Sequence, residues 1–150
     1  DMMLFMGLAN LPDIDFLIGY IVAADVHAFH QGPTHSVLFA VIAGCMAALI
    51  WRRNLSWGLS ATVFTLTILS HDLVDIFTGP MLGLHPSYGV PLLWPFYIER
   101  VVAPVTLLPS IQHDTLARFL SWHNAAAMLY EVAVFGLMAG LVFWRFSRRT

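Results

Sequence analysis

The sequence predicts an all-α fold, a polytopic membrane helical bundle with about four to five membrane-embedded helices and one re-entrant or interfacial segment. Hydrophobic residues make up 59% of the chain and charged residues only 11%, whereas about a quarter of the residues of a soluble domain are charged. The mean hydropathy is +0.75. Long apolar runs end at arginine clusters or at Gly-Pro pairs. A soluble protein with a large buried core is the alternative.

The length and net charge of the chain narrow the class of protein further. The 150 residues suit one membrane-embedded domain, 1–150. The net charge of −2 gives no reason to expect nucleic-acid binding. Cys45 stands alone, so it forms no intrachain disulfide and is interpreted as a small packing residue. Residues 2–11 are apolar but shorter than the roughly 20 residues that cross a bilayer, so we expect this helix to begin upstream of Asp1.

The first half of the chain contains two helices and a polar connection. The first helix ends at Pro12, which breaks it. Residues 16–24 form a short apolar half-helix or interfacial helix, and residues 25–34 form a connection with a Gly-Pro turn signal. Residues 35–51 form the second membrane helix, with Thr34 or Ser36 as its cap.

The second half contains two longer apolar runs. Residues 55–78 form the third membrane helix, which Gly79 and Pro80 end. Residues 80–100 form a loop with aromatic residues suited to a membrane interface. Residues 101–111 are apolar but short and contain two prolines, which favours a re-entrant or interfacial segment. Residues 112–124 are polar, and residues 125–144 form the last membrane helix, which only Glu131 interrupts.

Arginine clusters predict the orientation in the membrane. Arg52 and Arg53 lie between the second and third helices, and Arg145, Arg148 and Arg149 follow the last one. By the positive-inside rule both places are cytoplasmic. The second helix therefore begins, and the third ends, at the non-cytoplasmic face.

Six aspartate and histidine residues lie toward that face. Ionisable groups at membrane depth are costly and point to function, and imidazole and carboxylate suit Zn²⁺, Mn²⁺ or Fe²⁺. Six ligands are more than one tetrahedral zinc ion binds, and they suit two ions that share carboxylates. The alternatives to a metal site are that these residues form turn hydrogen bonds, lie in interfacial loops or make structural polar contacts. The predicted metal ligands are Asp13, Asp15, His30, His35, His71 and Asp75.

Two further carboxylates are candidates for proton transfer. Asp72 is rotated about 100° from His71 on a helix, so it faces elsewhere, although it could support a ligand. Glu131 lies inside the last helix and is expected to point into the bundle, as a general acid, a supporting group or a protonated structural carboxyl. The remaining histidines, His27, His85, His113 and His123, are weaker candidates.

Four motifs in one order resemble the YdjM-like family of bacterial inner-membrane proteins, which carry a metal-dependent hydrolase label. They are Leu-Pro-Asp-Ile-Asp at 11–15, His-Gln-Gly-Pro-Thr-His-Ser at 30–36, Ser-His-Asp-Leu-Val-Asp at 70–75 and Leu-Trp-Pro-Phe at 93–96. The resemblance implies a multi-helix membrane protein whose metal site is built from the six Asp and His residues. It also implies a distant similarity to zinc-dependent phospholipase C and to P1-type nucleases. Phe16 and Gln31 stand where family members often have His and Arg, which puts the substrate class or the activity in doubt.

We therefore expect a multi-pass protein of the bacterial inner membrane with its site on the non-cytoplasmic side. The expected function is metal-dependent hydrolysis of a phosphoester in a lipid or lipid-linked substrate through activated water. Zinc is the first choice of metal, as one or two ions, with manganese or iron as alternatives. A second hypothesis is a noncatalytic accessory subunit that binds a membrane protein or a second copy. An ion-coupled transporter ranks last, because no inverted repeat is visible.

Overall fold

The computed structural model describes residues 2–51, 55–112 and 115–148 and is mostly helical. Two two-residue strands, which an all-α class does not include, pair in parallel as β1 (Thr78–Gly79) and β2 (Leu108–Pro109). The helices are α1 (Met2–Ala9), α2 (Ile14–Ala23), α3 (Val37–Trp51), α4 (Trp57–Ile76), α5 (Leu116–Phe119) and α6 (Trp122–Ser147).

The helices confirm the class of helical membrane protein. Among the described residues, two helices are long and apolar enough to cross a membrane, Trp57–Ile76 and Trp122–Arg145. The helices α1 and α2 make a third candidate if they form one span bent by 54°. With the shorter apolar helix α3, these elements agree with the lower end of the expected number.

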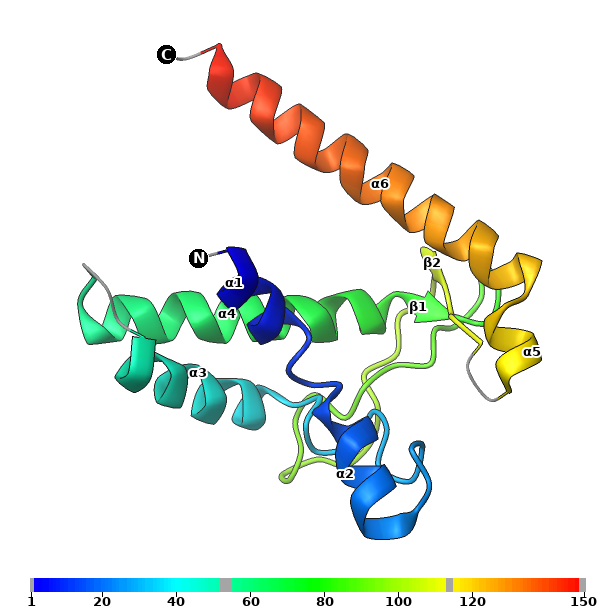
Figure 1. Ribbon diagram of the computed structural model, residues 1–150, viewed down its shortest axis with the longest axis horizontal. Coiled ribbons are helices and arrows are strands. Elements are labelled where there is room, and N and C mark those ends of the chain that lie inside the picture. The colour runs from blue at the N-terminus through cyan, green and yellow to red at the C-terminus, as the bar shows by residue number, and fades with distance from the viewer. Residues whose placement is uncertain (1, 52–54, 113–114, 149–150) are drawn as a thin grey trace.

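The core lies where α3 and α1 pack against α4 (Figure 1). Small residues allow α3 and α4 to approach closely, as is common between membrane helices. A Cβ atom added to Gly44 of α3 would lie 2.7 Å from the backbone nitrogen of Thr65 in α4. The buried apolar residues of this core are Leu8, Ala40, Ala48, Ala61, Phe64 and Ile68.

Local hydrogen bonds explain where the helices begin. The hydroxyl of Ser56 accepts from the backbone N–H of Leu59 and caps α4. The hydroxyl of Ser36, one of the two predicted caps, accepts from the N–H of Phe39 at the start of α3. The backbone N–H of His35 donates to the carbonyl of Gly32, so His35 belongs to the turn that precedes α3.

The segment 101–111 is extended rather than helical. Its backbone bonds to the preceding loop: Val101 and Val90 exchange hydrogen bonds, and the N–H of Thr106 donates to the carbonyl of Gly83. These bonds pair backbone groups of a segment in which two prolines disfavour a regular helix. The expected interfacial segment is thus part of a loop layer that covers the end of α4.

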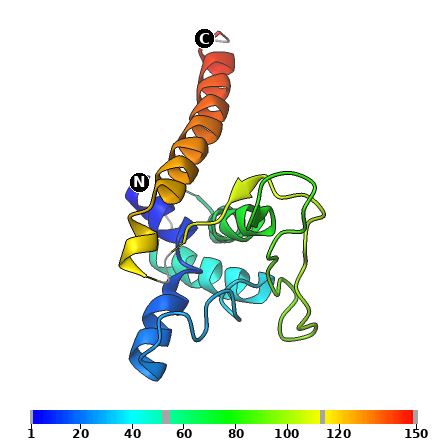
Figure 2. The ribbon, with the colours of Figure 1, turned by 90° about the vertical axis from the view of Figure 1, so that its right-hand side faces the viewer.

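Helix α6 leaves this layer and diverges from the other helices. It contacts α5 and β2 near its N-terminal end and then runs apart (Figures 1 and 2). Its C-terminal end lies on the same side of Figure 1 as the start of α4, whereas β1 and β2 lie on the opposite side. The residues Asp1, Arg52, Arg53, Asn54, His113 and Arg149, on which some expectations rested, lie outside the described residues.

Candidate metal centre

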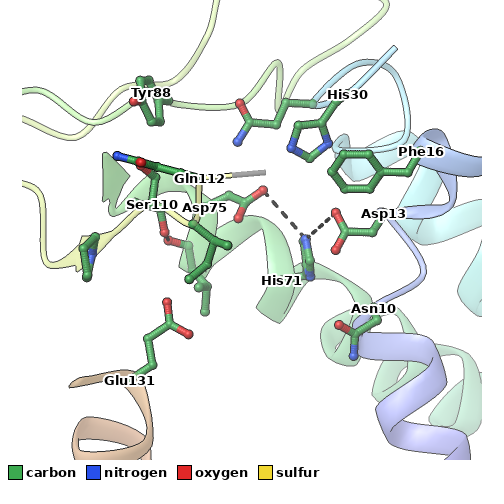
Figure 3. Close-up of a pocket in the computed structure, with 15 residues that line it drawn as sticks. Asn10, Asp13, Phe16, His30, His71, Asp75, Tyr88, Ser110, Gln112 and Glu131 are labelled. Carbon is green, nitrogen blue, oxygen red and sulfur yellow. Dashed lines mark hydrogen bonds and ion pairs between the residues drawn. The ribbon is translucent and has the colours of Figure 1, made fainter. Parts of the chain in front are cut away.

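The break between α1 and α2 places the first two carboxylates. Pro12 is buried at this break, and Asp13 and Asp15 follow it. Asp13 occupies the N-cap position of α2, yet its side chain makes no capping hydrogen bond. Turn chemistry therefore does not account for the direction of its carboxylate, which points toward His71 (Figure 3).

Four side chains from three segments converge beside this break. The Nε2 atom of His35 lies 3.7 Å from Oδ1 of Asp13 and 3.3 Å from Oδ2 of Asp75. The Nε2 atom of His71 lies 3.4 Å and 3.7 Å from the same two oxygens. Ligand atoms around a tetrahedral zinc ion with bonds of about 2.1 Å are about 3.4 Å apart. The nitrogen–oxygen separations are therefore compatible with atoms that bind one ion.

One nitrogen of this group is buried without a hydrogen-bond partner. The ring of His35 is fully buried, and its Nε2 makes no hydrogen bond of acceptable geometry despite the two carboxylate oxygens near it. A buried polar atom in this state costs free energy unless something satisfies it. A cation between His35, Asp13 and Asp75 would do so, and these residues fit a divalent metal ion.

The opposite edge of the His35 ring is held by Asp15. The Nδ1 atom of His35 lies 3.3 Å from Oδ2 of Asp15, and the same carboxylate accepts from the N–H of Gln31 at 2.9 Å and the hydroxyl of Thr34 at 3.2 Å. Its other oxygen lies 3.3 Å from Nδ1 of His30. A carboxylate behind a histidine in this way fixes the proton on Nδ1 and leaves Nε2 free to bind a metal.

The negative charge of the cluster affects the pKa of His35. Burial, the largest single influence, lowers the pKa of His35, but the carboxylates of Asp13, Asp15 and Asp75 together raise it to about 11. The site therefore attracts positive charge strongly. A proton on His35 and a metal ion compete for this position, because a ligating imidazole must be neutral.

Five of the six predicted ligands form two overlapping groups of candidate ligand atoms, and the sixth, Asp75, lies beside the first group. The ligand atoms of Asp13, His35 and His71 lie within 4.8 Å of one another, and so do those of Asp15, His30 and His35. Asp75 is in neither group, but its Oδ2 atom lies 3.3 Å from Nε2 of His35 and 3.7 Å from Nε2 of His71. The ring of His30 also stacks on Phe16, with centroids 4.0 Å apart. The metal-binding role of each residue stays a prediction.

The two proton-transfer candidates lie in different surroundings. Asp72 lies one helical turn after Ile68 on the buried face of α4 and is 1% exposed. Neither of its carboxylate oxygens has a hydrogen-bond partner. Glu131 of α6 instead lines a cavity of about 710 Å³ together with Asp13, His71 and Asp75.

The other histidines lie away from the cluster where the structure describes them. The backbone N–H of His27 donates to Asp25, and its ring packs edge-on against Phe16. His85 lies in the loop before α5, and Nε2 of His123 lies 2.9 Å from the carbonyl oxygen of Ser110. None of them belongs to either group of ligand atoms among the described residues.

Several residues of the site were missed by the sequence analysis. Thr34, considered only as a helix cap, donates to Asp15 instead. Asn10, Tyr88 and Gln112 line the cavity, and Arg100 donates to the side-chain oxygen of Gln31 at 2.7 Å. The polar residues 34–36 just before an apolar helix are the one sequence signal that could have indicated Thr34. The other residues reach the site through loop packing, which the sequence pattern does not show.

Comparison with known proteins gives two matches. Residues 1–150 match a family model described as YdjM inner membrane protein. A relative from Escherichia coli strain K12, described as inner membrane protein YbcI, is 31% identical over 153 residues, which cover 95% of this chain and 84% of the relative. No solved structure matches the chain.

Proposed function

Because this chain belongs to the YdjM inner membrane protein family, as its four motifs predicted, we propose that it is a membrane-bound, metal-dependent hydrolase that cleaves a phosphoester of a lipid or lipid-linked substrate. The family and its relative are described as inner membrane proteins, and neither description names a reaction. The observation that carries the proposal is that the carboxylates of Asp13 and Asp75 lie against both the buried, unpartnered Nε2 of His35 and the Nε2 of His71.

The four converging residues would hold one divalent ion, with zinc as the first choice and manganese or iron as alternatives. Such an ion lowers the pKa of a water molecule and stabilises negative charge on a phosphoryl group. Asp15 would orient the ring of His35, because its oxygens already lie against hydrogen-bond donors from Gln31 and Thr34. His30, which lies against the other oxygen of Asp15, would hold that carboxylate in place. Two ions with all six residues as ligands are the alternative.

The cavity next to the cluster suits the polar end of an amphiphile. Its volume of about 710 Å³ lies within the range of roughly 300–1,000 Å³ typical of small-molecule sites. It is lined both by α4 and by α6, which are each of membrane-spanning length. Hydrolysis there would form one P–O bond from water and break the ester P–O bond, with one proton passing to the leaving alcohol.

The arginines that the structure describes support one membrane side for the site. Arg145 and Arg148 lie at the C-terminal end of α6, on the opposite side of Figure 1 from β1 and β2, where the metal cluster and cavity are found. Arginine-rich ends are cytoplasmic by the positive-inside rule. We therefore propose that the site faces the non-cytoplasmic side.

Metal content and hydrolysis test the proposal together. Protein purified without chelators should contain about one zinc ion per chain and hydrolyse a chromogenic phosphodiester. His71→Ala should lose the metal and lower the rate by more than about 100-fold, beyond what loss of an orienting residue costs. His85→Ala is the matched control, because His85 lies in a loop outside both ligand groups. Absence of a transition metal, with a rate that His71→Ala leaves unchanged, would contradict the proposal.

A noncatalytic accessory role is the second candidate, because apolar surface remains uncovered. Phe96 is 89% exposed, and an apolar groove of about 330 Å³ runs between Val37 of α3 and Tyr97 of the loop. A membrane-protein partner or a second copy could bind there. Copurification of a stable partner, with cellular function unchanged by Asp75→Ala, would favour this role over catalysis.

A further inference from the structure

The carboxylate of Glu131 is placed in the cavity without a part in the metal cluster. It is the only acidic residue of α6, whose other residues are mainly apolar. Its side chain is half-buried and points into the cavity, at the end away from Phe16 and His30 (Figure 3). A carboxylate in a membrane helix is costly and is retained where it meets a partner or a substrate.

The cavity is lined by three carboxylates and by two histidines, His30 and His71, and a histidine that binds a metal ion is neutral. Asp13, Asp75 and Glu131 contribute carboxylates, and no arginine or lysine belongs to the lining among the described residues. A divalent ion held by the cluster would be balanced by Asp13 and Asp75. The guanidinium of Arg100 lies behind Gln31, where it donates to the Gln31 side chain and to the carbonyl of Gly89. The charge of Glu131 is thus left for the substrate to balance.

A phosphodiester group carries one negative charge, which the metal cluster would attract and Glu131 would repel. If the lipid headgroup that carries the phosphodiester also carries an amine, its ammonium group would pair with the Glu131 carboxylate. This pairing would offset the repulsion between Glu131 and the phosphate. Charge-assisted hydrogen bonds of this kind are stronger than neutral ones, and like charges brought together in a partly desolvated site are costly.

We propose that Glu131 is a specificity-determining residue that binds an ammonium group, so that the substrate is a zwitterionic phospholipid with an amine in its headgroup. The reaction class rests on the proposed function above. The phosphate would lie at the metal cluster and the ammonium at Glu131. The acyl chains would stay in the bilayer beside α6, which contacts α5 and β2 but diverges from the other membrane helices.

Lipid competition tests the headgroup site without requiring turnover. Zinc-loaded protein is offered equal amounts of dioleoyl phosphatidylethanolamine and dioleoyl phosphatidylglycerol, and the lipid retained is measured by native mass spectrometry. We expect the wild-type protein to retain the ethanolamine lipid about tenfold over the glycerol lipid. Glu131→Gln should bring this ratio close to one. The matched control Glu99→Gln, which removes a carboxylate that hydrogen-bonds Tyr97 outside the cavity, should preserve it.

Equal retention by the wild-type protein, or an unchanged ratio in Glu131→Gln, would overturn the inference. A Glu131→Gln variant that loses hydrolysis of every substrate by one factor, with its lipid preference intact, would also overturn it and indicate proton transfer. Hydrolysis of a chromogenic phosphodiester by the wild-type protein tests the proposed function separately. Hydrolysis without lipid preference removes this inference alone, and lipid preference without hydrolysis removes the hydrolase proposal alone.

Discussion

At the scale of single residues, His35 holds the site together, because each of its ring nitrogens meets a different carboxylate environment. Nε2 lies between Asp13 and Asp75, and Nδ1 lies against Asp15 and Thr34. The ring is fully buried, so no solvent can replace a lost partner. Substitutions on the two sides should therefore have different effects.

Asp15→Asn should weaken metal binding, and Asp75→Asn should nearly abolish it. The first change removes the charge behind the His35 ring, a loss that costs roughly 10–100-fold in metal affinity at such sites. The second turns a carboxylate, whose Oδ2 lies 3.3 Å from Nε2 of His35 where the ion would lie, into a neutral amide that binds a metal ion poorly. Competition titration with a zinc chelator measures both. Equal losses in the two variants would contradict the division of roles.

The metal-free protein should become less stable as the pH rises above neutral. Neighbouring carboxylates raise the pKa of His35 from its ordinary value of 6.5 to about 11, so the folded state holds this proton more tightly than the unfolded state. The stabilisation is complete below about pH 6.5 and is lost toward about pH 11. Thermal unfolding in detergent at several pH values measures it. His35→Gln should flatten this dependence, and an equally steep profile in that variant would assign the effect to another group.

At the scale of elements, the approach of α3 to α4 positions the site. The turn before α3 carries His35, and the last turns of α4 carry His71 and Asp75. Their separation therefore depends on how closely the two helices pack at Gly44 and Thr65. Gly44 and Thr65 lie roughly two helical turns from His35 and His71, so their packing should influence the geometry of the candidate metal site.

Gly44→Ala should destabilise the protein and weaken metal binding. Its added Cβ would lie 2.7 Å from the Thr65 nitrogen and 2.9 Å from the Thr65 Cα, both backbone atoms that cannot move aside. Overpacking of this kind costs about 1–3 kcal/mol. Gly58→Ala is the matched control, since its Cβ would have no atom within 4 Å. Thermal unfolding and zinc titration compare the two. A Gly44→Ala variant as stable as Gly58→Ala would show that α3 can shift without cost.

The element boundaries also show how far local sequence reaches. The third helix was expected at 55–78 and is found at Trp57–Ile76, because Ser56 caps its start and Thr78 enters β1. The second was expected from residue 35 and begins at Val37, because the hydrogen bond from His35 to Gly32 belongs to the preceding turn. Apolar runs predict the helices well, whereas the pairing of β1 with β2 joins residues thirty positions apart, which local pattern does not encode.

At the scale of the whole molecule, the orientation in the membrane can be measured directly. In a Cys45→Ala background, Leu84→Cys in the loop layer should react in intact cells with a membrane-impermeant maleimide. Arg148→Cys at the end of α6 should react only after lysis. Leu84 is 90% exposed, so lack of access would reflect the membrane side rather than burial. The opposite labelling pattern would place the site on the cytoplasmic face.

The amino-acid sequence by itself determined the helical membrane class, the family and the set of six Asp and His residues. Hydropathy, breaker residues and short motifs are local properties, and a sequence displays them without knowledge of packing. Only the tertiary structure decided that His35 faces Asp13 and Asp75 with one nitrogen and Asp15 with the other. It also decided that Asp72 is buried in the core, whereas Glu131 lines the cavity beside the candidate ligands. These outcomes depend on the rotation and approach of helices distant in sequence, which side-chain packing sets.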